Sequence, residues 1–156
     1  MERNSMLQKK DGWCGPAALS YALKKYGKQV SQEEIVKETD TTEESGTETW
    51  DLKKSVLKHG FVPQVLPSQE KDKTFEIIKF LVGTKIPVLI DYLDGNTIED
   101  GHYAVIDKIV GDEITLFNPS KGEETISKDW LFKRWKDVNA NDKVFKNWAM
   151  AVIKKI

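Results

Sequence analysis

Near its N-terminus the chain carries the stretch GWCGPAAL, residues 12–19. Apolar side chains continue it at the i, i+3, i+4, i+7 spacing of an amphipathic helix, at Leu19, Ala22, Leu23 and Tyr26. Pro16 suits the first helical turn, and Gly27 suits the end of the helix. This pattern predicts a helix over residues 15–26, which is the best-defined element of the sequence.

Cys14 stands at the start of this helix and is the single cysteine of the chain. A helix start presents unpaired N–H groups and the positive end of the helix dipole, and both favour a thiolate. The alternative is a small buried hydrophobic residue, the usual state of a free cysteine, and position alone leaves the two open. One cysteine excludes an internal disulfide and a zinc site made of several thiolates.

Further helices are expected early in the chain and strands later. Ser31 and Glu34 form a capping-box pattern for a short helix that runs through Glu38. Two more helices are predicted to end at Gly60 and Gly83. Stretches rich in β-branched and aromatic residues predict antiparallel strands at residues 86–93, 102–110 and 113–118.

The last part of the chain is expected to add one helix and one central strand. Ser127 can cap a short helix that carries Leu131 and Trp135, and residues 148–153 are apolar on both faces. Helices followed by strands indicate an α+β fold in which the N-terminal helical part packs on an antiparallel sheet. No linker rich in Pro, Gly or Ser divides the sequence, so we expect a single domain over residues 1–156.

Composition excludes several classes of protein. The 24 Lys and Arg residues against 25 Asp and Glu residues leave a net charge of −1, without the basic field of a nucleic-acid binder. No apolar run approaches the roughly 18 to 20 residues that span a bilayer, and the first residues contain no signal-peptide apolar segment. We expect a cytoplasmic protein if Met1 is the native start, and otherwise an exported one whose leader has been removed.

Two histidines are candidates for a general base. His102 stands at the start of a predicted strand, where scaffolds often present functional groups. His59 lies in the last turn of a predicted helix, where an imidazolium is favoured for structural reasons. His102 is therefore the better candidate. Its ring needs an acceptor that fixes its tautomer, and Asn118 ends the strand that follows.

With these residues the sequence resembles the C39 peptidase family and its standalone C39-like relatives, which have a papain-like fold. The matching positions are Gln8, the helix start at residues 14–19, the GHYAV stretch at residues 101–105, and Asn118-Pro119. Weaker matches extend the resemblance to Trp135, so that it covers most of the chain.

The resemblance implies a cysteine peptidase that needs no metal and no organic cofactor. Cys14 would be the nucleophile, His102 the general base and acid, Asn118 the residue that orients His102, and Gln8 an oxyanion-hole donor. Members that process double-glycine leader peptides have Asp before Pro at the third position, where this chain has Asn118. A neutral amide can fix the histidine ring but stabilises an imidazolium less than a carboxylate does. Asn also serves in papain-like proteases, so the departure does not exclude peptidase activity. It does weaken the inference that the substrate is a leader peptide.

The spacing of Gln8 and Cys14 carries its own requirement. Six extended residues span about 20 Å, so Gln8 can approach the thiol only if the segment curls back. Gly12 supplies the freedom to do so. The Gln8 amide and the Cys14 backbone N–H would then face the oxygen that becomes negative in a tetrahedral intermediate. The alternative is an exposed glutamine near the terminus.

The strand register poses a further condition for the proposed triad. A two-residue turn at Gly111-Asp112 with regular strands would set Asn118 opposite Val105, on the other face of the sheet from His102. A bulge or a longer loop around residues 108–112 restores a common face. We therefore predict such an irregularity.

The leading function is a cysteine peptidase, or a related acyl-transfer enzyme, that acts on a peptide or protein substrate, with a leader peptide as one candidate. Two alternatives remain open: a non-catalytic peptide-binding module of the same fold, and a transferase that uses a cysteine acyl-enzyme.

Residues 31–51 form an acidic stretch, because they hold eight acidic residues and one lysine. These acids either line the cleft and attract basic peptides, or simply face water.

Overall fold

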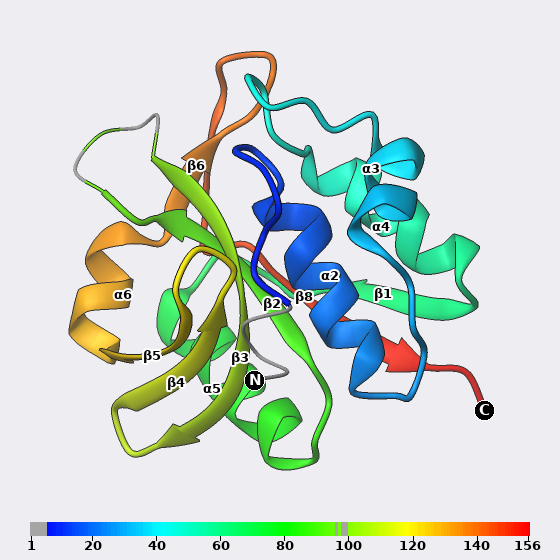
Figure 1. Cartoon of the computed structure of the whole chain (residues 1–156). Coiled ribbons are helices and arrows are strands. Elements are labelled where there is room, and N and C mark those ends of the chain that lie inside the picture. Colours follow the sequence, from blue (N-terminus) through cyan, green and yellow to red (C-terminus); the bar gives the residue numbers. More distant parts are fainter. Residues whose placement is uncertain (1–5, 96, 98–99) are drawn as a thin grey trace.

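The computed structural model describes residues 6–95, 97 and 100–156 (Figure 1). The N-terminal part contains three helices, Cys14–Lys24 (α2), Gln32–Thr39 (α3) and Thr49–Lys58 (α4). A strand and a helix follow, Phe61–Val65 (β1) and Lys71–Gly83 (α5). The rest consists of the strands Val88–Leu93 (β2), Gly101–Val110 (β3), Glu113–Asn118 (β4) and Gly122–Ser127 (β5), the helix Lys128–Arg134 (α6), and the strands Lys136–Val138 (β6), Val144–Lys146 (β7) and Ala149–Lys154 (β8).

Six of these strands form one antiparallel sheet in the order β1-β8-β2-β3-β4-β5, and β6 pairs with β7. The predicted antiparallel sheet is confirmed. So is the central position of the strand predicted at residues 148–153, because β8 lies between β1 and β2. β1 and β5 were not predicted from the sequence; they are the edge strands, and β1 carries Pro63, which edge positions tolerate.

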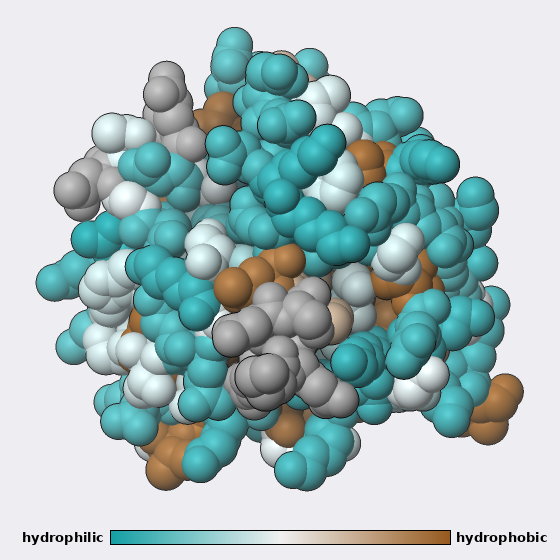
Figure 2. Space-filling view, viewed as in Figure 1, coloured by the Kyte–Doolittle hydropathy of each residue, from teal (hydrophilic) through white to brown (hydrophobic). Residues whose placement is uncertain are grey.

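Helices cover both faces of the sheet (Figure 1). Leu89, Val105 and Phe117 pack in one hydrophobic cluster with α2, α3 and α4. Their neighbours along the strands point the other way, and Ile90, Ala104 and Leu116 pack in a second cluster with α5 and α6. The alternation follows from the two-residue period of a strand. On the face drawn in Figure 2, the side chains are mainly hydrophilic, and the apolar ones lie in separate small patches.

α2 is the helix that the sheet and the other helices enclose. Every residue from Gly15 to Leu23 is buried, and Leu19 and Leu23 are fully so. Each such leucine contributes about 1.5–3 kcal/mol to stability. The helix begins at Cys14 and ends at Lys24, two residues before the predicted end, because a turn that Gly27 closes with a positive φ takes over there. This burial gives Cys14 a rigid support.

The predicted helix caps are present. The Ser31 hydroxyl accepts a hydrogen bond from the Glu34 N–H at 3.1 Å, and the Ser127 hydroxyl accepts one from the Trp130 N–H at 3.0 Å. Within the part of the chain that the structure describes, no helix is long and apolar enough to cross a bilayer. The cytoplasmic location stays a prediction.

The pairing of β3 with β4 contains the expected irregularity. Gly111-Asp112 forms a two-residue turn, so no longer loop is present. The register shifts between Ile106 and Lys108, which leaves Asp107 as the extra residue of a β-bulge. The bulge is thus confirmed, one residue before the predicted range.

The bulge has a partner on α2 that explains its position. The Tyr21 hydroxyl donates to Asp107 Oδ2 at 2.8 Å, and Lys25 Nζ lies 2.7 Å from Asp107 Oδ1. The extra residue therefore ties the sheet to the buried helix. Beyond the bulge Val105 pairs with Phe117, so Asn118 falls on the same face as His102.

Candidate active site

Cys14 is the first residue of α2 and is half-buried. No side chain caps the N-terminus of this helix, and its first turn contains no acidic residue. The positive end of the helix dipole and the N–H groups of the first turn therefore act on Cys14 without a competing anion. This is a suitable place for a thiolate and for an oxygen that gains negative charge.

The segment before Cys14 curls back as predicted. Gly12 has a φ of +78°, and a Cβ there would lie 2.5 Å from the carbonyl oxygen of Thr42. Only glycine fits this backbone and this close approach. The curl brings Gln8 to the end of β4, where its N–H donates to the Pro119 carbonyl at 2.8 Å.

The Gln8 side chain lies at the same cleft as Cys14 and His102. In this structure its Nε2 donates to the Lys10 carbonyl at 3.0 Å, and its Oε1 accepts from the Ser120 hydroxyl at 3.3 Å. The position agrees with the expectation for an oxyanion donor, although the amide is turned toward protein groups. Its role in catalysis stays a prediction.

His102 and Asn118 are brought together. Both are buried, and His102 Nε2 lies 2.6 Å from Asn118 Oδ1. This contact leaves Nδ1 of the ring for Cys14, with which His102 also shares a hydrogen bond. The structure thus aligns Cys14, His102 and Asn118 in the order that a nucleophile, a base and an orienting group require.

Glu124 fixes the Asn118 amide, a contact that the sequence did not reveal. Asn118 Nδ2 donates to Glu124 Oε1 at 3.0 Å, and the backbone N–H of Ser120 donates to Asn118 Oδ1 at 2.9 Å. With the nitrogen held by a carboxylate, the amide oxygen must face His102. Finding Glu124 would have required the β4–β5 register, where it pairs with Leu116.

Opposing influences act on the pKa of His102. Burial is the strongest and lowers it, but the hydrogen bond and charge of Cys14, followed by the hydrogen bond of Asn118, outweigh burial. The pKa of His102 is therefore raised above its ordinary value of 6.5. The charged form of the ring therefore persists to a higher pH than in an ordinary histidine.

Replacing Cys14 with alanine should lower the pKa of His102. The variant removes both contributions of Cys14 that raise the pKa, while burial, which lowers it, remains. The chain has two histidines, so a His59→Gln background leaves a single imidazole for NMR titration of the ring. An unchanged pKa in the Cys14→Ala variant would mean that Cys14 and His102 are not coupled.

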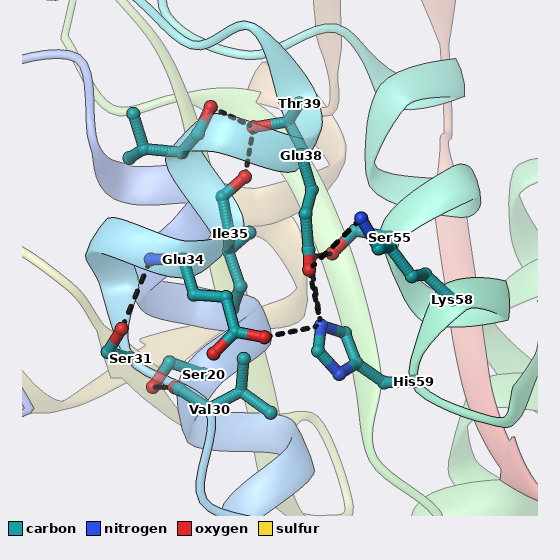
Figure 3. Close-up of polar contacts among 11 residues, drawn as sticks. Ser20, Val30, Ser31, Glu34, Ile35, Glu38, Thr39, Ser55, Lys58 and His59 are labelled. Atoms are coloured by element: carbon teal, nitrogen blue, oxygen red, sulfur yellow. Dashed lines mark hydrogen bonds and ion pairs between the residues drawn. The ribbon is translucent and has the colours of Figure 1, made fainter.

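His59 does not line the cleft that contains Cys14, and its ring contacts Glu38 instead. Its Nε2 lies 2.8 Å from Glu38 Oε1, and the Ser55 hydroxyl donates to the same oxygen at 2.7 Å (Figure 3). These contacts join α3 to α4. They give His59 a structural role, in line with its rank as the weaker candidate for the base.

One group among the described residues has the side chains to hold a metal ion. The ligand atoms of Glu34, Glu38 and His59 lie within 4.8 Å of one another. Direct contacts already satisfy Glu38, as Figure 3 shows, so the cluster is explained as a hydrogen-bonded join between two helices.

The cleft has a volume of about 670 Å³ and is strongly acidic. Glu43, Glu44 and Glu48 line it. Part of the acidic stretch therefore reaches the cleft, which is one of the two alternatives expected from the sequence. Other acids of the stretch have local partners, for example Glu33, which pairs with Lys9 at 2.9 Å. Asp91 and Asp137 also line the cleft, although neither was predicted from the sequence as a site residue.

Comparison with known proteins places these observations in a family. A model of the peptidase C39 family matches residues 2–140. The lactococcin-G-processing and transport ATP-binding protein LagD of Lactococcus lactis subsp. lactis is 29% identical over 127 residues, which are 75% of this chain and 16% of that protein. The chain therefore spans only about a sixth of this relative.

Solved structures confirm the fold. The peptidase domain of Streptococcus ComA, a bi-functional ABC transporter involved in quorum sensing, matches with a TM-score of 0.76 and 18% identity, over 96% of both chains. A double-glycine motif protease from an AMS/PCAT transporter, solved in complex with the leader peptide, matches with a TM-score of 0.67 and 18% identity, over 96% of this chain and 89% of that one. The predicted α+β, papain-like fold is thus confirmed.

Proposed function

The chain belongs to the peptidase C39 family, and we propose that it cleaves peptide bonds through the thiolate of Cys14. The observation that carries this proposal is the alignment of the α2 N-terminus with the pair formed by His102 and Asn118, 2.6 Å apart. We propose that one peptidase domain, residues 1–156, performs the reaction.

The proposed reaction has two halves. The Cys14 sulfur attacks the substrate carbonyl carbon, and the oxygen that becomes negative faces the α2 N-terminus and Gln8. The C–N bond then breaks as the His102 imidazolium donates its proton to the leaving amine, which leaves a thioester on Cys14. In the second half His102 takes a proton from water, and the hydroxide attacks the thioester and releases the acid and the thiolate.

A leader peptide that ends in a double glycine is the first substrate to test. One solved neighbour is a double-glycine motif protease in complex with its leader peptide, and the relative LagD is described as processing lactococcin G. Incubation with such a synthetic peptide should yield two fragments that intact-mass analysis identifies, and Cys14→Ala should yield none. Binding by Cys14→Ala without cleavage by the wild type would favour a binding module. Transfer of the acyl group to an added amine would favour a transferase.

The Asn118→Asp variant, which restores the residue of the leader-processing members, should lower kcat/KM by about tenfold at neutral pH. The new carboxylate would face Glu124 Oε1, now 3.0 Å from the Asn118 nitrogen, so a hydrogen bond becomes a like-charge contact. Glu124→Gln supplies a donor in place of the charge and should restore the activity of Asn118→Asp. Peptide turnover by the four variants of this cycle measures the coupling. Full activity of Asn118→Asp alone would show that Glu124 does not select the amide.

A further inference from the structure

The cleft beside Cys14 has a one-sided charge. Six of the residues that line it are acids, Glu43, Glu44, Glu48, Asp91, Asp137 and Asp142, and none of its described lining residues is Lys or Arg. Low-dielectric walls lined by one sign of charge concentrate ligands of the opposite sign. Exposed acids alone give only a diffuse attraction that salt weakens, so a specific site needs a more defined group.

Asp91 is that group, because it is buried and lies at the base of the cleft. It occupies the middle of β2, where every residue is buried, and it is 2% exposed. Its Oδ1 has no hydrogen-bond partner among the described residues. A buried carboxyl oxygen without a donor is costly, and a positive charge held close to it offsets part of that cost.

Asp137 of β6 lies against Asp91 and forms a carboxyl pair with it. Burial raises the pKa of Asp91 well above its ordinary value of 3.8, and the hydrogen bond and charge of Asp137 raise it further. Gly101 makes room for the pair, because a Cβ at this position would collide with the Asp137 carboxylate. Glycine at residue 101 thus allows a second carboxyl group next to His102.

The pair is adjacent to the reacting groups. The charge of Cys14 acts on the Asp91 carboxyl, and the backbone N–H of His102 donates to it. A group bound by the pair would therefore belong to the part of the substrate near the bond that is cleaved. The metal-compatible group among the described residues is the separate one at His59, which does not include this pair.

We propose that Asp91 and Asp137 form a subsite that binds a basic side chain of the peptide substrate, an ammonium or a guanidinium. The cation pairs with Asp137 in the cleft and offsets the negative charge that remains on the hydrogen-bonded pair of carboxyl groups. The acids of residues 43–48 and Asp142 then steer basic peptides into the cleft. This inference rests on the proposed function, since it assigns a substrate preference to the same cleft.

The test uses a fluorogenic peptide library in which each position is fixed in turn as Lys, Arg, Gln, norleucine or Glu. At one position the wild type should prefer Lys or Arg over norleucine by about tenfold or more in kcat/KM. In Asp137→Asn and in Asp91→Asn this ratio should fall toward one. Glu76→Gln removes an exposed acid of α5 outside the cleft and should leave the ratio unchanged.

Failure of the subsite and failure of the peptidase are separable. Binding of the same peptides to Cys14→Ala, measured by fluorescence anisotropy, reports the subsite without turnover. A preference for basic peptides in binding, with no cleavage by the wild type, would retain the subsite and reject the peptidase. Cleavage at equal rates for Lys and norleucine, or a Lys preference that both Asn variants keep, would overturn the subsite. Because Asp91→Asn alters a buried position, Asp137→Asn and circular dichroism keep the result interpretable.

Discussion

Replacing Cys14 with serine should lower peptide turnover by a factor of about 10⁴ or more while the protein stays folded. A serine hydroxyl is not ionised at neutral pH, and this site is arranged around a thiolate and an imidazolium. Cys14 is half-buried at the edge of the first hydrophobic cluster, so the loss of sulfur costs little packing. Turnover of a double-glycine peptide and thermal unfolding of both proteins check the two parts.

One result would reject this role for Cys14. If Cys14→Ser cleaves the peptide at a rate near that of the wild type, the chemistry does not pass through this residue. If the variant unfolds, Cys14→Ala offers the same test without a new hydroxyl in the buried part of the site.

His102→Ala should lower kcat by about 10³-fold or more, whereas His59→Gln should retain most turnover. In the proposed mechanism His102 carries the proton between Cys14, the leaving amine and water, and it interacts with both Cys14 and Asn118. His59 instead lies 2.8 Å from Glu38 and joins two helices, and Gln can still donate to that carboxylate (Figure 3). Steady-state kinetics of the two variants give the ranking.

Loss of His59 should instead lower the stability of the protein. Glu38 is buried, with its side chain 6% exposed, so loss of the His59 contact in His59→Ala should cost about 1–3 kcal/mol of unfolding free energy. A His59 variant that is stable but inactive, beside an active His102 variant, would reverse the assignment of the base.

The helices and central strands could be predicted because their signals are local. The apolar spacing around Leu19 and the caps at Ser31 and Ser127 act within one or two turns, and β4 was predicted with its observed ends. The edge strands lacked such a signal. β5 is largely polar and half exposed, and β1 contains Pro63, so both depend on the neighbouring strand for their structure.

The site was predicted in part for a related reason. The need for a bulge followed from the two-residue period of strands, but its location at Asp107 depends on Tyr21 and Lys25, which lie more than 80 residues away in the sequence. Glu124 could not be recognised without the strand register. Asp91 had a usable signal, because an acidic residue within the apolar stretch VLIDYL is unusual for a buried strand.

If His102 and the α2 N-terminus activate Cys14, the alkylation rate of Cys14 should report that activation. Cys14 is the single thiol of the chain, so intact mass after treatment with iodoacetamide at pH 6 reports this residue alone. We predict that native Cys14 reacts faster than Cys14 in the unfolded chain, and that His102→Ala removes most of the difference. A native rate no faster than the unfolded rate would mean that His102 and the α2 N-terminus do not activate Cys14.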